Sequence, residues 1–200
     1  MTTTFFLLRH AAHDNVGGYL AGRMPGVRLG ENGRAQARRL GERMKRETFA
    51  AIHASPRERT QETAQAVAEA AGITEVSVAL ELDEIDFGEA WMGKDFDTLN
   101  RDWHWRRWNE ARSVTRTPGG ETMLDVQRRA LGLIERLAAA YSGAALALVT
   151  HADVIKAIVS HVLGLPIDAW NRFEVGPASI STLVTGEWGA KLLTLNEVVA

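Results

Sequence analysis

Polar residues with reactive side chains follow short apolar runs at two distant places in this sequence. Arg9 and His10 come directly after the run 5–8, and His151 comes just after the run 145–149. Short, continuous apolar runs are typical of strands that are buried on both faces of a parallel sheet. In open α/β sheets, ligands bind beyond the carboxyl ends of the strands. We therefore expect these two imidazoles and the guanidinium group to meet at one edge of a sheet.

Two further groups of polar residues follow other predicted strands. The segment 55–59 comes after a strand expected at 49–54, and Glu84 comes after one expected at 76–82. The complete set then holds two imidazoles, one or two guanidinium groups and a carboxylate. Guanidinium groups hold a phosphoryl group through paired hydrogen bonds, a neutral imidazole can attack phosphorus, and a protonated carboxyl can protonate the leaving oxygen. The set therefore predicts phosphoryl chemistry.

Several neighbouring residues compete for these positions. Either Arg57 or Arg59 could supply a second guanidinium group. Ser55 could contact a phosphate, or it could only cap a helix that has Pro56 in its first turn. Three other acidic residues compete with Glu84 for the carboxylate position: Asp83, Asp86 and Glu89. We expect the remaining histidines to be structural or exposed, except that the first of them could line the site: His13, His53, His104 and His161.

The residues between these motifs predict alternating strands and helices. The expected strands are 4–9, 49–54, 76–82, 144–150, 180–185 and 191–196, of which the last two form a hairpin. The expected helices are 31–48, 56–71, 121–141 and 153–163. This order predicts a three-layer α/β/α fold around a mainly parallel six-stranded sheet, with one antiparallel strand near an edge. The Trp- and Arg-rich segment 91–118 predicts a helical lid inserted into a single domain of residues 1–200.

The composition argues against several classes of protein. Because the net charge is −2, we do not expect nucleic acid as a partner. The sequence has no cysteine, so it can form neither a disulfide nor a thiolate nucleophile. No apolar run is long enough to cross a bilayer, and the N-terminus does not resemble a signal peptide. We therefore expect a cytoplasmic protein that does not associate with membranes.

Neither a metal ion nor an organic cofactor is expected. The strand-end histidines would have arginine neighbours, whereas a divalent cation would favour carboxylates. The first strand is also not followed by the Gly-rich fingerprint that binds dinucleotides. This argues against a nucleotide-dependent oxidoreductase on a similar sheet.

Six short motifs, in order along nearly the whole chain, resemble those of the histidine phosphatase superfamily, which includes cofactor-dependent phosphoglycerate mutases. The first resembles the family signature "RHG", although Ala11 stands where the family has glycine. Asn15 aligns with a family asparagine only through a gap. The matching residues are Arg9-His10; Gly22-Arg23, Leu29, Gly33 and Gln36-Ala37; Ser55, Arg59, Thr63 and Ala64; Leu82-Asp83-Glu84, Phe87-Gly88 and Gly93; Pro118-Gly119-Gly120-Glu121-Thr122; and Val149-Thr150-His151.

The resemblance implies a role for each matching residue. His10 would be the nucleophile that becomes phosphorylated, and Glu84 would act first as general acid and then as general base. Three residues would clamp the phosphoryl oxygens: Arg9, Arg59 and His151. The residues expected to bind the rest of the substrate are Asn15, Gly22, Arg23, Ser55 and Ala152. The protein would then be a metal-independent acid-type phosphatase that acts on a small phosphomonoester and releases inorganic phosphate. Whether it forms a homodimer stays open.

The resemblance leaves more than one activity open. The short stretch between Glu84 and His151, together with the sequence 87–93, resembles the phosphatase branch, including broad-specificity phosphatases. The segment 103–121 is similar to that of α-ribazole phosphatases. The main alternative is a cofactor-dependent phosphoglycerate mutase. A non-catalytic module that binds phosphorylated ligands is less favoured, because the histidines and arginines of the core motifs are all present.

Overall fold

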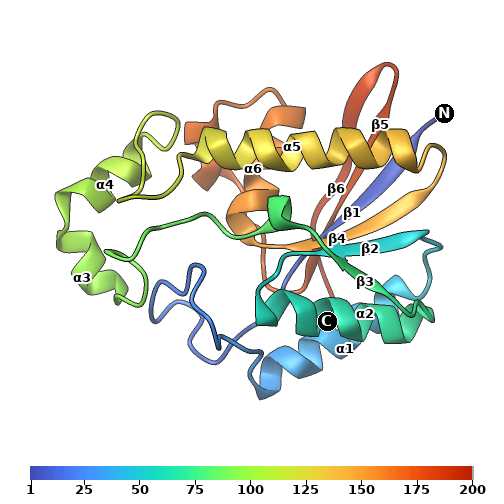
Figure 1. Ribbon diagram of the computed structural model, residues 1–200, viewed down its shortest axis with the longest axis horizontal. Coiled ribbons are helices and arrows are strands. Elements are labelled where there is room, and N and C mark those ends of the chain that lie inside the picture. The colour runs from blue at the N-terminus through green and yellow to red at the C-terminus, as the bar shows by residue number, and fades with distance from the viewer. Residues whose placement is uncertain (200) are drawn as a thin grey trace.

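The computed structural model describes residues 1–199, which build one six-stranded sheet with helices on both faces (Figure 1). The strands are β1 (Thr3–Arg9), β2 (Ala51–Ala54), β3 (Val76–Val78), β4 (Ala145–Thr150), β5 (Ser179–Gly186) and β6 (Gly189–Val198). Their order is β3-β2-β4-β1-β5-β6. Strands β1 to β4 are parallel, whereas β5 runs antiparallel to both of its neighbours, β1 and β6. The predicted sheet, with one antiparallel strand near an edge, is confirmed.

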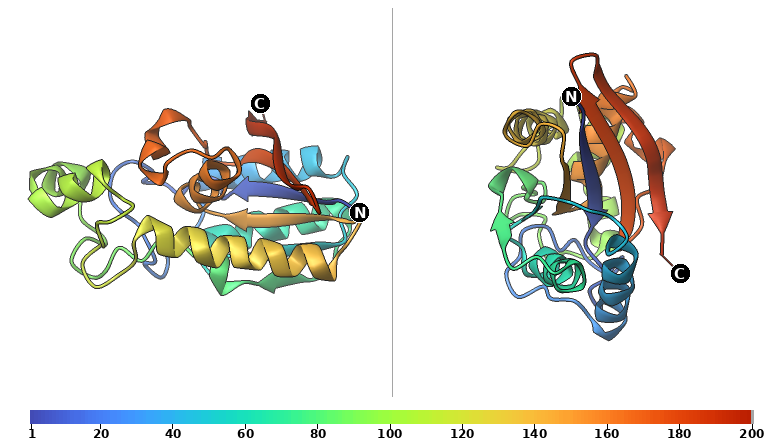
Figure 2. Two further views of the ribbon diagram at one scale, coloured as in Figure 1. Left: turned by 90° about the horizontal axis from the view of Figure 1, so that it is seen from above. Right: turned by 90° about the vertical axis from the view of Figure 1, so that its right-hand side faces the viewer.

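Four helices cover the two faces of this sheet: α1 (Glu31–Met44), α2 (Glu58–Ala71), α5 (Met123–Ala140) and α6 (Ala152–Val162). Alternate side chains of β1 point to opposite faces. Phe6 and Leu8 pack in one core with α1 and α2, whereas Phe5 and Leu7 pack in the other with α5 and α6 (Figures 1 and 2). The three-layer α/β/α arrangement is therefore confirmed. None of the helices within residues 1–199 has the length and apolar character needed to span a bilayer.

The register of the parallel strands brings their carboxyl ends to one edge. Arg9, the last residue of β1, pairs with Thr150, the last residue of β4. On the other side of β4, Ala54 at the end of β2 pairs with Val149. The next residue of each chain segment therefore leaves the sheet at the same place, which explains how residues 10, 55 and 151 become neighbours.

The helix after β2 begins later than the sequence predicts. It starts at Glu58, and no side chain caps its first turn, so the prediction that Ser55 caps it is wrong. The carbonyl oxygen of Ser55 instead accepts hydrogen bonds from the side chains of Thr60 and Gln61. The hydroxyl group of Ser55 is left to face the neighbouring strand end.

Two other boundaries differ from the prediction by four residues, and one helical turn was not predicted. Strand β3 ends at Val78 instead of residue 82, because the chain turns there into a 3₁₀ helix, η1 (Leu80–Leu82). Helix α1 ends at Met44 instead of residue 48. A second 3₁₀ helix, η2 (Ile167–Arg172), follows α6 and was not predicted. Short 3₁₀ turns have no long periodic pattern by which a sequence could indicate them.

The segment 91–118 carries helices α3 (Phe96–Arg101) and α4 (Trp103–Glu110), which lie beyond the carboxyl ends of β1 and β4 (Figures 1 and 2). Three of its tryptophans are buried with ring centroids 5.2–6.1 Å apart: Trp91, Trp105 and Trp108. Trp103 is 71% exposed. The buried rings thus form a small core of this segment.

A buried cation attaches this segment to the body of the protein. Arg112 is 4% exposed, and its guanidinium carbon lies 3.8 Å from the ring centroid of Trp108 and 3.4 Å from that of Trp170 in η2. Its Nη1 lies 2.9 Å from Oδ1 of Asp153 in α6. Stacking and ion pairing together compensate for burial of this charge.

Candidate active site

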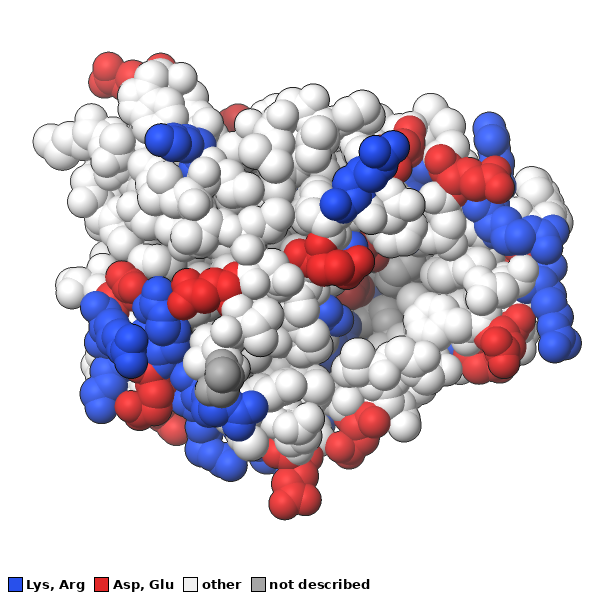
Figure 3. All heavy atoms as spheres, turned by 180° about the vertical axis from the view of Figure 1, so that it is seen from behind, with Lys and Arg blue, Asp and Glu red and all other residues white. Residues whose placement is uncertain are grey.

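A cavity of about 170 Å³ opens at the carboxyl edge of the sheet. Its wall includes Arg9 and His10 from the end of β1, Arg59 from α2 and Glu84 from the loop after η1. In Figure 3 the surface is hollowed between the body of the molecule and the segment that carries α3 and α4. The cavity therefore collects the residue types that phosphoryl chemistry requires.

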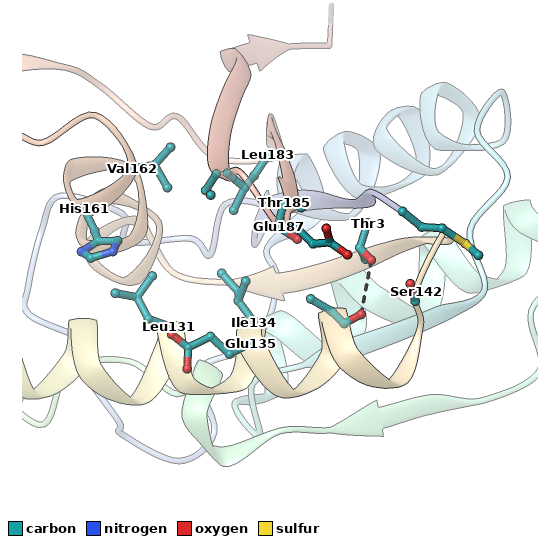
Figure 4. A pocket seen from close by; sticks show the side chains of 15 residues that line it. Thr3, Leu131, Ile134, Glu135, Ser142, His161, Val162, Leu183, Thr185 and Glu187 are labelled. Carbon is teal, nitrogen blue, oxygen red and sulfur yellow. Dashed lines mark hydrogen bonds between the residues drawn. The ribbon is translucent and has the colours of Figure 1, made fainter.

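A larger hollow of about 500 Å³ lies between α5, α6 and the β5–β6 hairpin, at the other end of the strands (Figure 4). Its walls carry Glu135, His161 and Glu187 above an apolar floor, and no lysine or arginine lines it. A phosphate group would gain no charge-assisted hydrogen bond there. We therefore assign the candidate site to the smaller cavity by its chemistry.

His10 is placed as a neutral nucleophile. Its Nδ1 lies 2.8 Å from the carbonyl oxygen of Ala11, which can only accept a hydrogen bond, so Nδ1 carries the proton. Its Nε2 then has a lone pair, toward which Nε of Arg59 points from 3.4 Å. Burial, and then the positive charges of Arg59 and Arg9, hold the pKa of His10 well below 6.5. The ring is therefore neutral at neutral pH, and its Nε2 carries no proton.

The ring of His151 lies beside that of His10, with 5.1 Å between their centroids. Its Nδ1 lies 3.2 Å from Nη2 of Arg59 and 3.4 Å from Oε2 of Glu84. Its Nε2 lies 2.8 Å from Oγ of Ser55. Burial, followed by the charge of Arg59, lowers the pKa of His151 well below 6.5. The predicted meeting of the two imidazoles at one sheet edge is therefore observed.

Two guanidinium groups present free donors at this site. Arg59 is 1% exposed and donates from Nη2 to the carbonyl oxygen of Gly22 at 2.7 Å. Its Nη1 and the Nε of Arg9 are buried without a hydrogen-bond partner among the described residues. Arg57 instead donates to the carbonyl oxygen of Arg23 and pairs with Asp83. Unpaired buried donors are costly, so Arg9 and Arg59 are suited to bind an anion.

Glu84 is the acidic residue of its loop that faces the cavity. Burial raises its pKa from 4.5 to about 7; the carboxylate of Asp153 adds to this effect, and Arg59 opposes it. Asp83 and Asp86 are instead paired with Arg23. Because its pKa lies near neutral pH, Glu84 can both donate and accept a proton there.

The loop after β1 is held by residues of the second and third motifs. The backbone nitrogen of Ala11 donates to Oγ1 of Thr63 at 3.0 Å, and that of Ala12 donates to Oε1 of Gln36 at 2.9 Å. A Cβ atom at Gly33 would lie 1.7 Å from the carbonyl oxygen of Ala12. Only glycine at this position lets α1 approach the loop so closely. These contacts fix the backbone around His10.

The loop that carries Glu84 is held by the fourth and fifth motifs. Gly88 has a φ of +69°, and a Cβ atom there would lie 1.6 Å from the carbonyl oxygen of Pro118. The carboxylate of Glu121 accepts hydrogen bonds from the backbone nitrogen of Asp86 at 3.0 Å and from Arg23 at 2.9 Å. The motifs therefore act together, far apart in sequence, to position one loop.

The predicted site residues fall into three groups: those that line the cavity, those behind its wall, and one that is exposed. Six of them line the cavity: Arg9, His10, Gly22, Arg59, Glu84 and Ala152. Ala152 is the first residue of α6, where a helix N-terminus favours an anion. His151 and Ser55 lie directly behind this wall, and Nε of Arg23 donates to the carbonyl oxygen of Glu84 at 2.7 Å. Asn15 is exposed and does not line the cavity, so its contact with a substrate stays a prediction.

Sequence reasoning missed part of the cavity wall. Asp153 follows His151 by two residues, so its place just beyond a strand end was a usable signal. Three aromatic residues also line the cavity: Tyr19, Phe87 and Phe96. Their positions depend on the conformations of the surrounding loops, which no periodic sequence pattern indicates. His13 lines the cavity, as the sequence allowed. No group of three or more His, Cys, Asp or Glu side chains within residues 1–199 is placed to hold a metal ion.

Replacing Arg59 by lysine is expected to weaken binding of inorganic phosphate by roughly 10- to 100-fold, because an ammonium group keeps the charge but loses the planar fork and its paired donors. The dissociation constant can be measured by calorimetry. Arg43→Lys is the matched control, since Arg43 on α1 pairs with Glu197 on β6, away from the cavity. Equal phosphate affinity in Arg59→Lys and the wild type would contradict this assignment.

Comparison with known proteins gives a consistent result. A model of the histidine phosphatase superfamily (branch 1) matches residues 5–198. Phosphoserine phosphatase 1 of Hydrogenobacter thermophilus is 30% identical over 170 residues, which cover 84% of this chain and 80% of that protein. A probable phosphoglycerate mutase of Salmonella choleraesuis is 30% identical over 157 residues, covering 78% and 72%. The structure of a mycobacterial glucosyl-3-phosphoglycerate phosphatase superimposes with a TM-score of 0.87 at 26% identity, covering 98% of this chain and 100% of that one.

Proposed function

Because the chain belongs to the histidine phosphatase superfamily (branch 1), we propose that it hydrolyses phosphomonoesters through a phosphohistidine on His10. The observation that carries this proposal is the lone pair of neutral His10, which faces a cavity with two unpaired, buried guanidinium donors. Glu84, partly protonated near neutral pH, lies on the same wall. Nucleophile, anion clamp and proton donor are thus within one small cavity.

In the first step, the phosphoryl group of the substrate binds between Arg9 and Arg59, which neutralise its charge. Nε2 of His10 forms a bond to phosphorus as the bond from phosphorus to the ester oxygen breaks. The carboxyl group of Glu84 gives its proton to that oxygen, so the alcohol leaves neutral. The products are the free alcohol, phosphorylated His10 and an ionised Glu84.

In the second step, the carboxylate of Glu84 takes a proton from water as the water oxygen attacks phosphorus. The bond from Nε2 of His10 to phosphorus breaks, and inorganic phosphate forms. His10 is again neutral with its proton on Nδ1, and Glu84 is again protonated. The two carboxyl states that the cycle needs are both populated near a pKa of about 7.

A phosphoglycerate mutase is the second candidate, because one relative at 30% identity carries that name. A mutase must also bind the carboxylate of its substrate. Within the described chain, the arginine and lysine side chains that line the cavity are those of Arg9 and Arg59, and both belong to the phosphoryl clamp. Arg112 is stacked between two indole rings and paired with Asp153, so it offers no free fork to a carboxylate. These observations favour hydrolysis of a small phosphomonoester.

The remaining features of the proposal follow the sequence expectations. We propose that residues 1–200 act as one domain in which 91–118 forms a lid, that catalysis requires neither metal nor cofactor, and that the protein works in the cytoplasm. Trp103 in the segment 91–118 is exposed, so its indole ring is available for a contact in a homodimer. Analytical ultracentrifugation of the full chain would establish the assembly.

The proposed activity is tested with p-nitrophenyl phosphate and a panel of phosphomonoesters in the presence of a chelator. The panel includes phosphoserine, sugar phosphates, phosphoglycerates, nucleotides and α-ribazole phosphate. We expect release of inorganic phosphate without any primer. Interconversion of phosphoglycerates that depends on added 2,3-bisphosphoglycerate, with little phosphate release, would favour the mutase. Absence of both activities would overturn the proposal.

A further inference from the structure

Asp83 is a buried carboxylate that the proposed reaction does not use. It is 6% exposed and does not line the cavity. Its Oδ1 accepts a hydrogen bond from the backbone nitrogen of Glu84 at 2.8 Å, and Nε of Arg57 lies 2.9 Å from the same oxygen. Its Oδ2 lies 3.3 Å from Nε of Arg23. Two guanidinium groups therefore pair with this carboxylate and hold it in place.

Ser55 connects this carboxylate to His151. Its Oγ lies 3.3 Å from Oδ1 of Asp83 and 2.8 Å from Nε2 of His151, and the whole serine is buried. An ionised carboxylate can only accept, so the hydroxyl proton of Ser55 points to Asp83. The lone pairs of the same oxygen are then left for Nε2 of His151. The chain of hydrogen bonds has a single direction, from imidazole to hydroxyl to carboxylate.

The opposite side of the imidazole agrees with this direction. Nη2 of Arg59 can only donate, and it lies 3.2 Å from Nδ1 of His151. The other neighbour of Nδ1, Oε2 of Glu84 at 3.4 Å, donates when that carboxyl is protonated. Nδ1 then accepts from both groups, and the proton of the neutral ring is on Nε2. Two separate sets of contacts, one on each ring nitrogen, give the same tautomer.

We propose that Asp83 is a positioning residue, which through Ser55 orients the ring of His151 and fixes its proton on Nε2. The proposal rests on the proposed function, with His151 as the third member of the phosphoryl clamp that the family resemblance implies. Asp83 also holds the backbone of Glu84, so one carboxylate positions two residues of the site. Asp83 itself does not touch the substrate.

The hydrogen-bond chain from His151 through Ser55 to Asp83 has a consequence for the complex with phosphate. In the free protein, burial and the charges of Arg59, Arg129 and Arg9 keep His151 neutral, because together they lower its pKa well below 6.5. A bound phosphoryl anion offsets these positive charges. A proton brought by the monoanionic form of the ligand can then reside on Nδ1, which donates to a phosphoryl oxygen. Ser55 and Asp83 stabilise the resulting imidazolium from the other side.

The test uses Ser55→Ala, Asp83→Asn and the double variant, with two measurements. Nitrogen-15 NMR of His151, with and without inorganic phosphate, reports which ring nitrogen is protonated. Steady-state kinetics report kcat and KM separately. In the wild type we expect the Nε2–H tautomer, changing to imidazolium with phosphate. In Ser55→Ala we expect loss of this preference and a fall in kcat of roughly 10- to 100-fold, as for loss of a hydrogen bond to a charged group.

The double variant shows whether Asp83 acts on His151 through Ser55 or whether the two residues affect kcat independently. If Asp83 acts on His151 through Ser55, the double variant should lose little more kcat than Asp83→Asn alone. Asp86→Asn is the matched control, because Asp86 also pairs with Arg23 but contacts neither Ser55 nor the backbone nitrogen of Glu84. We expect it to keep kcat within about threefold of the wild type, because the contacts of Asp83 with Ser55, Arg57 and the backbone of Glu84 all remain.

Two results would overturn the proposal: an Nδ1–H tautomer in the free wild type, or a Ser55→Ala variant with the tautomer and kcat of the wild type. The NMR measurement needs no turnover. A wild type that hydrolyses no phosphomonoester would therefore refute the proposed function while the tautomer still tests the role of Asp83. If Asp83→Asn fails to fold, Ser55→Ala carries the test, because it leaves both ion pairs of Asp83 in place.

Discussion

Replacing His10 by alanine is expected to lower phosphomonoester turnover by at least about 10⁴-fold, because it removes the nucleophile that divides the reaction into two easier steps. No neighbour can take its place. His151 points its Nδ1 at Arg59 and Glu84 and its Nε2 at Ser55, so neither ring nitrogen faces the cavity freely. The variant should still bind inorganic phosphate, since both guanidinium groups remain.

The measurement is twofold: steady-state release of phosphate, and trapping of an acid-labile phosphoprotein after mixing with a radiolabelled substrate. His13→Ala is the matched control, because His13 also lines the cavity, with its ring centroid 6.4 Å from that of His10. We expect that control to lose less than about tenfold, as for a residue that contacts but does not react. Turnover in His10→Ala within 100-fold of the wild type, or trapping of its label on another residue, would disprove the nucleophile assignment.

The sequence predicts the two central strands, β1 and β4, well because both are largely buried on both faces. The runs that become β1 and β4 have no helical period and end in polar residues, so both their type and their carboxyl ends are evident. Parallel pairing then brings residues far apart in sequence to one edge without any knowledge of the loops. His10 and His151 are neighbours for this reason alone.

Local rules fail where tertiary contacts compete with them. Ser55 has the residue type of a helix cap, but its hydroxyl group bonds to His151 and Asp83, and the helix begins three residues later. The strand pattern at 76–82 is broken because β3 pairs with a strand on one side only, which leaves the chain after Val78 free to turn. Burial of Arg112 could not be predicted, because it depends on an indole ring 58 residues further along the chain.

The choice among the acidic residues also depends on the fold. Four carboxylates lie within seven residues, and nothing in their spacing distinguishes them. The structure distinguishes them by partner: Arg23 and Arg57 neutralise Asp83, and Arg23 pairs with Asp86. Glu84 remains at the cavity with a raised pKa. The resemblance to the family selected the same residue, and the ion pairs supply the physical reason.

Replacing Glu84 by glutamine is expected to slow phosphorylation of His10 by about 10²–10⁴-fold for an alkyl phosphate, because the amide cannot protonate the leaving oxygen. For p-nitrophenyl phosphate the loss should be much smaller, since a nitrophenolate leaves without a proton. Rapid-quench measurement of the phosphohistidine separates this step from its hydrolysis. An equal loss for both substrates would show that Glu84 is not the general acid.

The pH dependence gives an independent test of the same residue. Because the pKa of Glu84 is raised to about 7, the acid form that the first step needs is lost as pH rises through that value. The phosphorylation rate with an alkyl phosphate should therefore fall above about pH 7 in the wild type and show no such fall in Glu84→Gln.

The stability of Glu84→Gln should change in the opposite sense to its activity. A carboxyl whose pKa is raised by folding contributes stability below its ordinary value of 4.5, and that contribution is lost as pH rises through about 7. Glu84→Gln lacks this loss, so at pH 8 it should unfold less readily than the wild type, by about 1–3 kcal/mol. A variant that is slower yet more stable cannot be explained by misfolding. A variant that is slower and less stable at pH 8 would instead place Glu84 among the residues that hold the loop, and the acid would have to be sought at Asp153.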